Sequence, residues 1–239
     1  MSVNPAKAHP IPGEVSRERR VAIFGGTFDP IHIGHLAVAR AAERRFHLDE
    51  IHFIPTGKPP HKNRSGMALY ADRYAMVALA CADHTRFIAS LAESGHGHSG
   101  KDVYYSVDTV RRFKQKFQGT NTHLYFLMGA DSFLHIPSWK DYEALLGLCD
   151  FIVVSRPGFR VEALRLVIPP ELLARPGAAH APLDPRAIAL RRTSVYVLDT
   201  VSSHVSATEV RGRLDRHESI HGLVPARVEE YITKQALYR

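Results

Sequence analysis

Short apolar runs that alternate with longer amphipathic segments are the feature of this sequence that most constrains its fold. The runs have the length and composition of buried strands, and the segments between them have helical spacing. Such alternation builds βαβ units, in which crossover helices join parallel strands. The sequence therefore predicts an α/β fold in a single domain. Strands are expected at residues 21–24, 51–55, 87–90, 124–128, 151–155 and 195–198.

Helices are expected between these strands and at the end of the chain. The predicted ranges are 34–46, 67–82, 106–117, 142–148, 208–215 and 225–235. Together the elements predict a doubly wound, Rossmann-like, mainly parallel sheet with helices on both faces. Ligands bind to such sheets outside the carboxyl ends of the strands, so the turns after the strands are the places to seek a site.

Two stretches depart from the alternation. Residues 1–20 combine prolines and arginines without an apolar run, so we expect a disordered leader and not a secretory signal. Residues 157–192 contain six prolines, so any helix there should be short and the rest should form a surface elaboration rich in Pro and Arg. The domain is therefore expected to span residues 21–239.

The composition excludes several classes of protein. No apolar run approaches the roughly 20 residues that span a bilayer, so we expect no contact with a membrane. Cys81 and Cys149 are too far apart for a disulfide framework or a thiolate zinc site, which favours a reducing, cytoplasmic location. The net charge of +7 lies mainly in residues 1–20 and 155–195. Because aromatic residues do not interleave these charges, a nucleic-acid partner is not expected.

The strongest functional signal follows the first predicted strand, where the chain reads GGTFDPIHIGH. Gly25 and Gly26 carry no Cβ, so the backbone there can approach a ligand closely. The helix that follows presents unpaired N–H groups and the positive end of its dipole, which favour a phosphate. His32 and His35 lie three residues apart at its start, so both imidazoles can reach one anion.

Other motifs of this kind do not fit the segment. The zinc-protease pattern needs histidines four residues apart with an intervening Glu, the Walker A loop ends in Gly-Lys-Ser/Thr, and the dinucleotide fingerprint is G-x-G-x-x-G. A glycine pair alone is most often a turn, and a lone histidine is more often a core or surface residue. The combination of strand, glycine turn and paired histidines is a more specific signal for a phosphate site than any of these features alone.

A second candidate phosphate site opens the helix expected at 208–215. Ser206 and Glu209 have the spacing of a capping box, in which Ser206 is the N-cap. Thr208 lies in the first turn, and Arg211 one turn further can add a charge-assisted hydrogen bond to a phosphate. Capping boxes are common, so this motif indicates a phosphate site only in combination with the GGTFDPIHIGH segment.

The two motifs together resemble the signatures of the HxGH nucleotidyltransferase superfamily, and the run GGTFDPIH is similar to that of bacterial nicotinate mononucleotide adenylyltransferases. The likeness covers about residues 21–156 and 195–239. It implies adenylyl transfer from ATP to nicotinate mononucleotide, giving deamido-NAD and pyrophosphate in NAD biosynthesis. It also implies Mg²⁺, bound mainly through the ATP phosphates, and no covalent nucleophile.

The resemblance implies three groups of site residues, and no protein-held metal. The catalytic candidates are His32 and His35, which donate hydrogen bonds to the phosphates and to the charge of the transition state. Contacts with ATP are expected from Gly25, Gly26, Thr27, Phe28, Lys58, His61, Lys62, Ser206, Thr208 and Arg211. Contacts with nicotinate mononucleotide are expected from Tyr105, Ser106, Asp131, Trp139 and Arg156, with Trp139 as the stacking face beside Tyr105.

Several alternatives stay open at this point. The acceptor could be nicotinamide mononucleotide, or the protein could bind nucleotides without catalysis on the same fold. Two other enzymes of this superfamily are disfavoured. A phosphopantetheine adenylyltransferase would usually have Thr where His32 stands, and a class I aminoacyl-tRNA synthetase would have a Lys-rich second motif in place of residues 206–211. The segment around His96 and His98 could hold a metal, but a Gly/Ser-rich loop is the stronger interpretation. Assembly into a homo-oligomer is left open.

Overall fold

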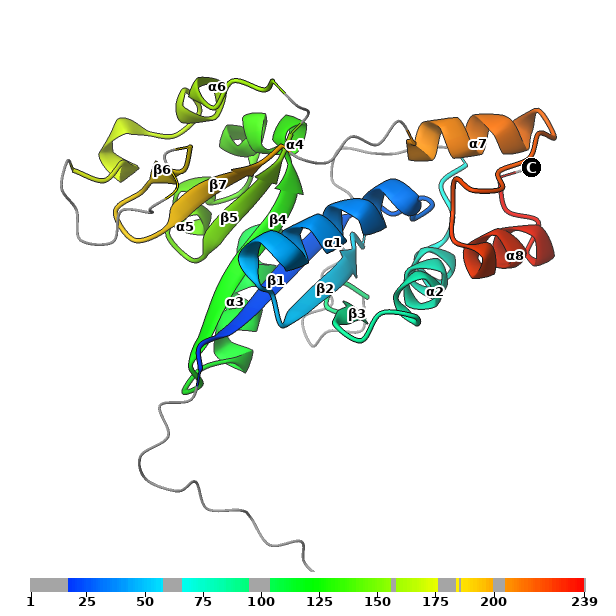
Figure 1. Ribbon diagram of the computed structural model, residues 1–239, viewed down its shortest axis with the longest axis horizontal. Helices are drawn as coiled ribbons and strands as arrows, with labels where there is room; N and C mark the ends of the chain where they lie inside the picture. Colours follow the sequence, from blue (N-terminus) through cyan, green and yellow to red (C-terminus); the bar gives the residue numbers. More distant parts are fainter. Residues whose placement is uncertain are drawn as a thin grey trace, which may run out of the picture.

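A seven-stranded sheet forms the centre of the computed structural model, which describes residues 17–57, 66–94, 104–155, 158–175, 184, 186–199 and 205–238 (Figure 1). The strands are β1 (Arg19–Gly26), β2 (Glu50–Pro55), β3 (Phe87–Ala89), β4 (Thr122–Gly129), β5 (Asp150–Val154), β6 (Ile188–Ala189) and β7 (Ser194–Leu198). Their order is β3-β2-β1-β4-β5-β7-β6, and only β6 pairs antiparallel, with β7. The predicted doubly wound sheet is confirmed.

Each of the expected helices is present, within a few residues of its predicted ends. The α-helices are α1 (Ile33–Phe46), α2 (Tyr70–Cys81), α3 (Ser106–Lys116), α4 (Ala130–Leu134), α5 (Tyr142–Leu146), α6 (Glu162–Arg165), α7 (Ala207–Asp215) and α8 (Ala226–Lys234). Two 3₁₀ turns, η1 (Ile136–Ser138) and η2 (Pro170–Leu172), complete the described elements. The sequence analysis did not predict α4 and α6, which have five and four residues and so offer little helical period. The equally short α5 was predicted.

Two hydrophobic cores lie on opposite faces of the sheet. On one face, Ala22 and Phe24 of β1 pack with α1, α2, α7 and α8; on the other, Val21 and Ile23 pack with α3, α4, α5 and α6 (Figure 1). Successive residues of a strand point to opposite faces. A central parallel strand is covered on both, which is why β1 reads as a continuous apolar run.

The first strand begins earlier than the sequence indicates. Arg19 lies opposite Thr122 of β4, and its guanidinium forms an ion pair with Glu50 of β2. Charged residues can therefore belong to this strand, because its amino end reaches the edge of the core. The predicted boundary between residues 20 and 21 thus falls inside β1, and residues 1–16 of the predicted leader lie outside the described residues.

The stretch 157–192 is more than a surface elaboration. In its described parts, Leu164, Ile168 and Ile188 are buried in the second core, and β6 adds an antiparallel edge strand to the sheet. The prolines do keep α6 and η2 short. Buried side chains therefore come from a segment whose helices and strand are too short to be detected from sequence.

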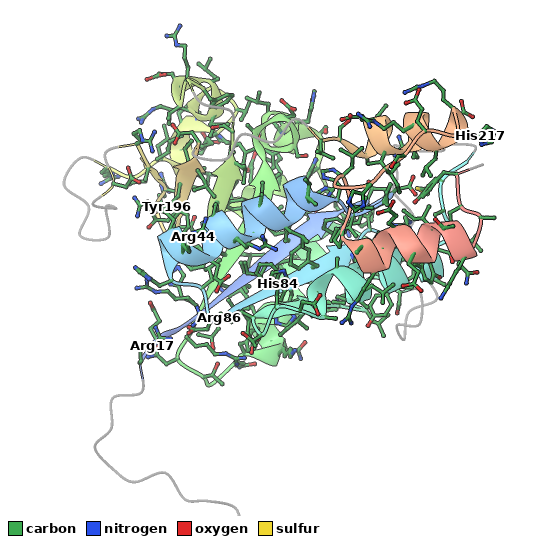
Figure 2. All side chains as sticks on the ribbon, turned by 45° about the vertical axis from the view of Figure 1, so that its right-hand side comes forward. Arg17, Arg44, His84, Arg86, Tyr196 and His217 are labelled. Carbon is green, nitrogen blue, oxygen red and sulfur yellow. The ribbon has the colours of Figure 1, made fainter. Side chains whose placement is uncertain are left out.

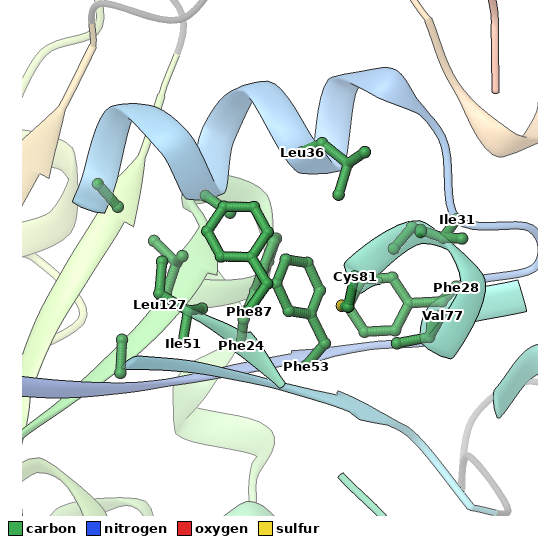
Figure 3. Packing of buried hydrophobic residues seen from close by; sticks show 14 of the residues in the cluster. Phe24, Phe28, Ile31, Leu36, Ile51, Phe53, Val77, Cys81, Phe87 and Leu127 are labelled. Carbon is green, nitrogen blue, oxygen red and sulfur yellow. The ribbon is translucent and has the colours of Figure 1, made fainter. Parts of the chain in front are cut away.

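The turn after β1 sends Phe28 back into the first core. Its side chain is 2% exposed, and its ring centroid lies 5.5 Å from Phe24 and 5.8 Å from Phe53 (Figure 3). The ring passes so close to Gly26 that a Cβ there would lie 2.9 Å from Cζ of Phe28. By contrast, a Cβ on Gly25 would meet Phe126 at 3.7 Å, an ordinary contact.

This geometry predicts different costs for two adjacent glycines. Gly26→Ala should lower the free energy of unfolding by about 1–3 kcal/mol, because the buried Phe28 ring must move. Gly25→Ala should stay within about 1 kcal/mol of the wild type. Urea unfolding of the two variants tests the difference, and equal losses would contradict the role given to Phe28.

Candidate active site

A cavity of about 500 Å³ lies at the carboxyl ends of β1 and β4. The chain leaves β1 toward β2 on one side and later returns to β4 on the other, so this is the point where the strand order reverses. Such a switch point leaves a crevice between the diverging connections. The cavity is lined by Thr27, Phe28, Asp29, His32, His35, Met67, Asp131, Val205, Ser206, Ala207, Thr208 and Arg211.

Most of the predicted phosphate contacts meet in this cavity. The residues after β1 and the residues that open α7 are far apart in sequence, yet they line the same space. Gly25 and Gly26 are not among the lining residues, and Gly26 instead accommodates the ring of Phe28. Lys58, His61 and Lys62, as well as Arg156, lie outside the described residues.

The two histidines stack at the start of α1. Their ring centroids are 3.8 Å apart, and the backbone N–H of His32 donates to Nδ1 of His35 at 3.2 Å. Since Nδ1 of His35 accepts, the neutral ring carries its proton on Nε2. His35 thereby has an N–H donor on the ring atom that points away from its own backbone, where a phosphate oxygen can accept it.

Burial keeps both imidazoles neutral. It lowers the pKa of His32 to about 4, and burial together with the charge of His32 holds the pKa of His35 well below its usual value. In the described part of the chain, Nδ1 of His32 is buried and has no hydrogen-bond partner. His32 itself lines the cavity, so its imidazole belongs to the wall of the site.

The second motif faces the histidines from α7. Ser206 is the N-cap of this helix, and its hydroxyl accepts a hydrogen bond from the backbone N–H of Glu209 at 3.1 Å. The Glu209 carboxylate accepts from Arg213 at 3.2 Å. Arg211 donates to the hydroxyl of Thr208 at 3.3 Å, so its guanidinium lies beside the first turn of α7. The N-termini of α1 and α7 therefore both open on the cavity.

Asp29 joins the two motifs. Nη1 of Arg211 donates to the backbone carbonyl of Asp29 at 2.5 Å, although 182 positions separate the two residues. The Asp29 carboxylate is 4% exposed and accepts from the backbone N–H of Ala68 at 3.1 Å. The turn after β1 is thus bonded to α7 and to the segment before α2.

Arg73, a buried cation that the sequence analysis missed, donates hydrogen bonds to the turn after β1. Arg73 of α2 is 1% exposed and donates to the carbonyl of Thr27 at 2.8 Å, to that of Gly57 at 3.1 Å and to that of Ala68 at 3.2 Å. Burial lowers the pKa of Arg73, an effect opposed by the nearby Asp29. Arg73 lies three residues before Met76, so a helical period places both on the buried face of α2. That spacing was the signal in the sequence that could have revealed Arg73 as a buried residue.

Gly57 is held from both sides where the chain leaves β2. Besides the bond from Arg73 to its carbonyl, its N–H donates to the carboxylate of Glu93 at 3.3 Å. A Cβ on Gly57 would lie 2.6 Å from the backbone oxygen of Glu93, so only glycine fits there. Burial raises the pKa of Glu93, which also accepts from Thr109 at 2.9 Å. These contacts fix the end of the strand that precedes Lys58.

The residues predicted to bind the pyridine nucleotide lie beside the cavity on the α3 side. Tyr105 is the N-cap of α3 and is exposed, and the ammonium of Lys140 lies 4.5 Å from the centre of its ring. Trp139, the neighbour of Lys140, is half-buried against Phe126, with ring centroids 6.4 Å apart. Neither aromatic residue lines the cavity.

Asp131 and Ser106 complete this group. Asp131 lies in the first turn of α4, is exposed and lines the cavity. Ser106 is the first residue of α3. The structure therefore brings Asp131 to the phosphate motifs, whereas Tyr105, Ser106 and Trp139 lie outside the cavity lining.

A second group of cations lies at the other end of the sheet. Arg17, Arg44 and Arg86 surround a shallow depression near the end of α1 that lies away from α7 (Figure 2). Arg17 forms an ion pair with Asp49, and Arg86 forms one with Glu43 at 3.2 Å. These charges are partly neutralised within the protein, so they do not extend the phosphate site.

The side chains that line the cavity fit a metal ion that arrives bound to a nucleotide. No three side chains of His, Cys, Asp or Glu lie close enough to form a metal cage in the described ranges. Asp131 offers an exposed carboxylate on the cavity wall. A magnesium ion usually takes one or two carboxylates and completes its shell with phosphates and water, which this arrangement allows.

The fold and the site together define a Rossmann-like nucleotidyltransferase. Residues 23–213 match the model of the cytidylyltransferase-like family. The chain is 39% identical over 219 residues to the probable nicotinate-nucleotide adenylyltransferase of Geobacter sulfurreducens, covering 92% of this chain and 98% of that protein. The corresponding protein of Moorella thermoacetica is 38% identical, with 94% of each chain covered. This chain belongs to the cytidylyltransferase-like family, among the nicotinate-nucleotide adenylyltransferases.

Solved structures share the fold. The nicotinic acid mononucleotide adenylyltransferase of Plasmodium falciparum, solved in complex with NaAD, superposes with a TM-score of 0.67 at 19% identity. The superposition covers 92% of this chain and 97% of the other. In the described residues, no helix has the length and apolar character needed to cross a membrane.

The buried histidine predicts how stability depends on pH. The unfolded chain protonates the imidazole of His32 near pH 6.5 and the folded chain only near pH 4, so the free energy of unfolding should fall as pH drops between these values. Between about pH 7 and about pH 5, His32→Gln should lose about 2 kcal/mol less than the wild type. Urea unfolding at the two pH values measures this.

The exposed His135 provides the control for this experiment. His135→Gln removes an exposed imidazole and leaves His32 in place. Equal acid sensitivity of the His32 and His135 variants would show that His32 is not buried as described.

Proposed function

We propose that this protein transfers the adenylyl group of ATP to nicotinate mononucleotide, which gives deamido-NAD and pyrophosphate in NAD biosynthesis. The observation that carries the proposal is the convergence of His32, His35 and Arg211, with two helix N-termini, on one cavity. The names of the 39% and 38% identical relatives supply the acceptor. The structures titled as complexes with NaAD and with APC support the same pair of substrates.

The proposed role of the cavity is to bind the triphosphate of ATP. Helix N-termini attract phosphate through unpaired N–H groups and the helix dipole, and both α1 and α7 supply one here. Arg211 adds a full positive charge beside α7, and Thr27 and Thr208 add hydroxyl groups. We assign Ser206 to capping α7, and Lys58, His61 and Lys62 to neutralising phosphate from the segment after β2.

The reaction itself needs positioning and charge stabilisation. A 5′-phosphate oxygen of the acceptor forms a bond to the α-phosphorus of ATP in line with the leaving pyrophosphate, whose bond to that phosphorus breaks. Negative charge builds on the bridging and leaving oxygens. We assign Nε2–H of His35 to donate a hydrogen bond to that charge, and His32, which lines the same cavity, to assist it.

The acceptor is assigned to the surface between α3 and α4. In this proposal, Trp139 and Tyr105 provide faces for the pyridine ring, Ser106 and Arg156 contact its nucleotide, and Asp131 binds a ribose hydroxyl. The cation of Lys140, held at 3.1 Å by Asp108 and placed over the ring of Tyr105, adds positive charge near the ring. A positive charge there favours the carboxylate of nicotinate over the amide of nicotinamide.

Magnesium is the proposed cofactor. When bound, it would neutralise part of the phosphate charge that builds as pyrophosphate leaves. Its ligands would be mainly the ATP phosphates and water. The proposal further places the enzyme in the cytoplasm, supported by two cysteines that are both free and buried. It treats the described residues from β1 onward as one domain. Assembly into a homo-oligomer is not required, since one chain lines the cavity.

Pyrophosphate release tests the function directly. With ATP and Mg²⁺, nicotinate mononucleotide should be preferred over nicotinamide mononucleotide and phosphopantetheine at equal concentration. Preference for another acceptor would overturn the assignment of the acceptor surface and retain the phosphate site. Absence of release with all three would favour a nucleotide-binding protein without this activity.

The catalytic assignment predicts the effect of one substitution. His35→Gln should lower kcat/KM by about 10²–10³-fold, because a preorganised donor to the transition state is lost from a site shielded from water. His84→Gln is the matched control and should keep full activity, because His84 follows α2, contacts Arg40 of α1 and does not line the cavity. Near-normal turnover of a folded His35→Gln variant would contradict the mechanism.

A further inference from the structure

The end of the chain reaches the phosphate site through one hydroxyl. Tyr238 follows α8, and its OH donates to Oδ1 of Asp29 at 2.7 Å, although 209 positions separate the two residues. Oδ1 also accepts the backbone N–H of Ala68 at 3.1 Å. Asp29 is the residue whose backbone carbonyl holds Arg211. A residue of the C-terminal tail is therefore two hydrogen bonds away from a cation that lines the cavity.

We infer that Tyr238 is a positioning residue for the phosphate site: its hydroxyl holds the Asp29 carboxylate so that the guanidinium of Arg211 remains available to the ATP phosphates. The inference deepens the function proposed above and rests on it.

The distances around Asp29 explain why the hydroxyl matters. Nη1 of Arg211 lies 2.5 Å from the Asp29 backbone carbonyl but 3.8 Å from Oδ2, too far for a hydrogen bond to the carboxylate. Two neutral donors instead satisfy Oδ1. If one of these donors is removed, the carboxylate of Asp29, a residue that is only 4% exposed, loses a hydrogen bond that water cannot easily replace. Arg211 is the cation on the cavity wall that can move to replace it.

The Asp29 carboxylate and Arg211 form an ion pair at 3.8 Å, and a closer, hydrogen-bonded contact between them would weaken binding of phosphate. The guanidinium would be turned toward the carboxylate, and part of its charge would be neutralised before ATP arrives. Tyr238 prevents this because a hydroxyl satisfies the carboxylate without adding charge. Burial, and then the bond to Asp29, raise the pKa of Tyr238, so its hydroxyl remains a donor at every working pH.

The C-terminal segment supplies a matched control. Tyr231 of α8 also donates its hydroxyl to a carboxylate, Oδ1 of Asp72 in α2, at 2.9 Å. Both tyrosines therefore tie the end of the chain to the body of the protein by one hydrogen bond of similar length. Only the bond of Tyr238 leads to a cavity residue, since Asp72 does not line the cavity.

Phenylalanine substitutions in the full-length protein test the inference. Tyr238→Phe removes only the hydroxyl and should lower kcat/KM for ATP by about tenfold, mainly through a higher KM for ATP. The KM for nicotinate mononucleotide should remain within about twofold. Tyr231→Phe should leave all these constants within about twofold, while the two variants lose similar thermal stability. Equal kinetic effects of the two variants would overturn the inference.

A double-mutant cycle separates positioning from general loosening. In an Arg211→Gln background, Tyr238→Phe should cause no further loss beyond about twofold, because Tyr238 acts through the guanidinium that is already absent. If the two losses multiply instead, Tyr238 does not act through Arg211, and the inference is wrong.

Binding of an unreactive ATP analogue distinguishes this inference from the proposed function. Calorimetry should show about tenfold weaker binding of α,β-methylene-ATP to Tyr238→Phe than to the wild type or Tyr231→Phe. Absence of pyrophosphate release by the wild type would count against the proposed reaction alone, since the calorimetric comparison does not depend on an acceptor. Unchanged affinity of Tyr238→Phe for the analogue would overturn the role of Tyr238.

Discussion

The hydrogen bonds of Asp29 hold together the parts of this protein that are distant in sequence. Its carboxylate and carbonyl connect the turn after β1 with Ala68 before α2, with Arg211 on α7 and with Tyr238 at the end of the chain. A buried carboxylate is costly unless donors satisfy it, so these segments are constrained to meet at one place. That place is the wall of the cavity, and the histidines that follow Asp29 in sequence are positioned by the same turn.

Burial gives the site its electrostatic character. The imidazoles of His32 and His35 are neutral because the surrounding protein destabilises their charged forms. They can therefore donate or accept hydrogen bonds without first releasing a proton. The positive potential comes from two helix N-termini and from the guanidinium of Arg211. Arg73 supports the same turn through three backbone carbonyls.

Much of the fold was predictable from the sequence for a simple reason. Strands covered on both faces must be apolar throughout, and crossover helices must be amphipathic, so both leave a local pattern. The GGTFDP and HIGH segments were recognisable because a phosphate site at a helix N-terminus is built from consecutive residues. The two residues of β6 and the four of α6 lie in a stretch interrupted by prolines and leave no such pattern. The segment of the buried Leu164 was accordingly assigned to the surface.

The sequence by itself thus determined the α/β class, the order of the main elements and the two motifs that supply phosphate-binding groups. Only the tertiary structure decided that both motifs face one cavity, that Gly26 serves the ring of Phe28, and that Tyr238 reaches Asp29. The physical reason is the range of the interactions. Helical and strand periods depend on neighbours within a few residues, whereas these contacts join side chains whose proximity exists only after the sheet has brought its connections together.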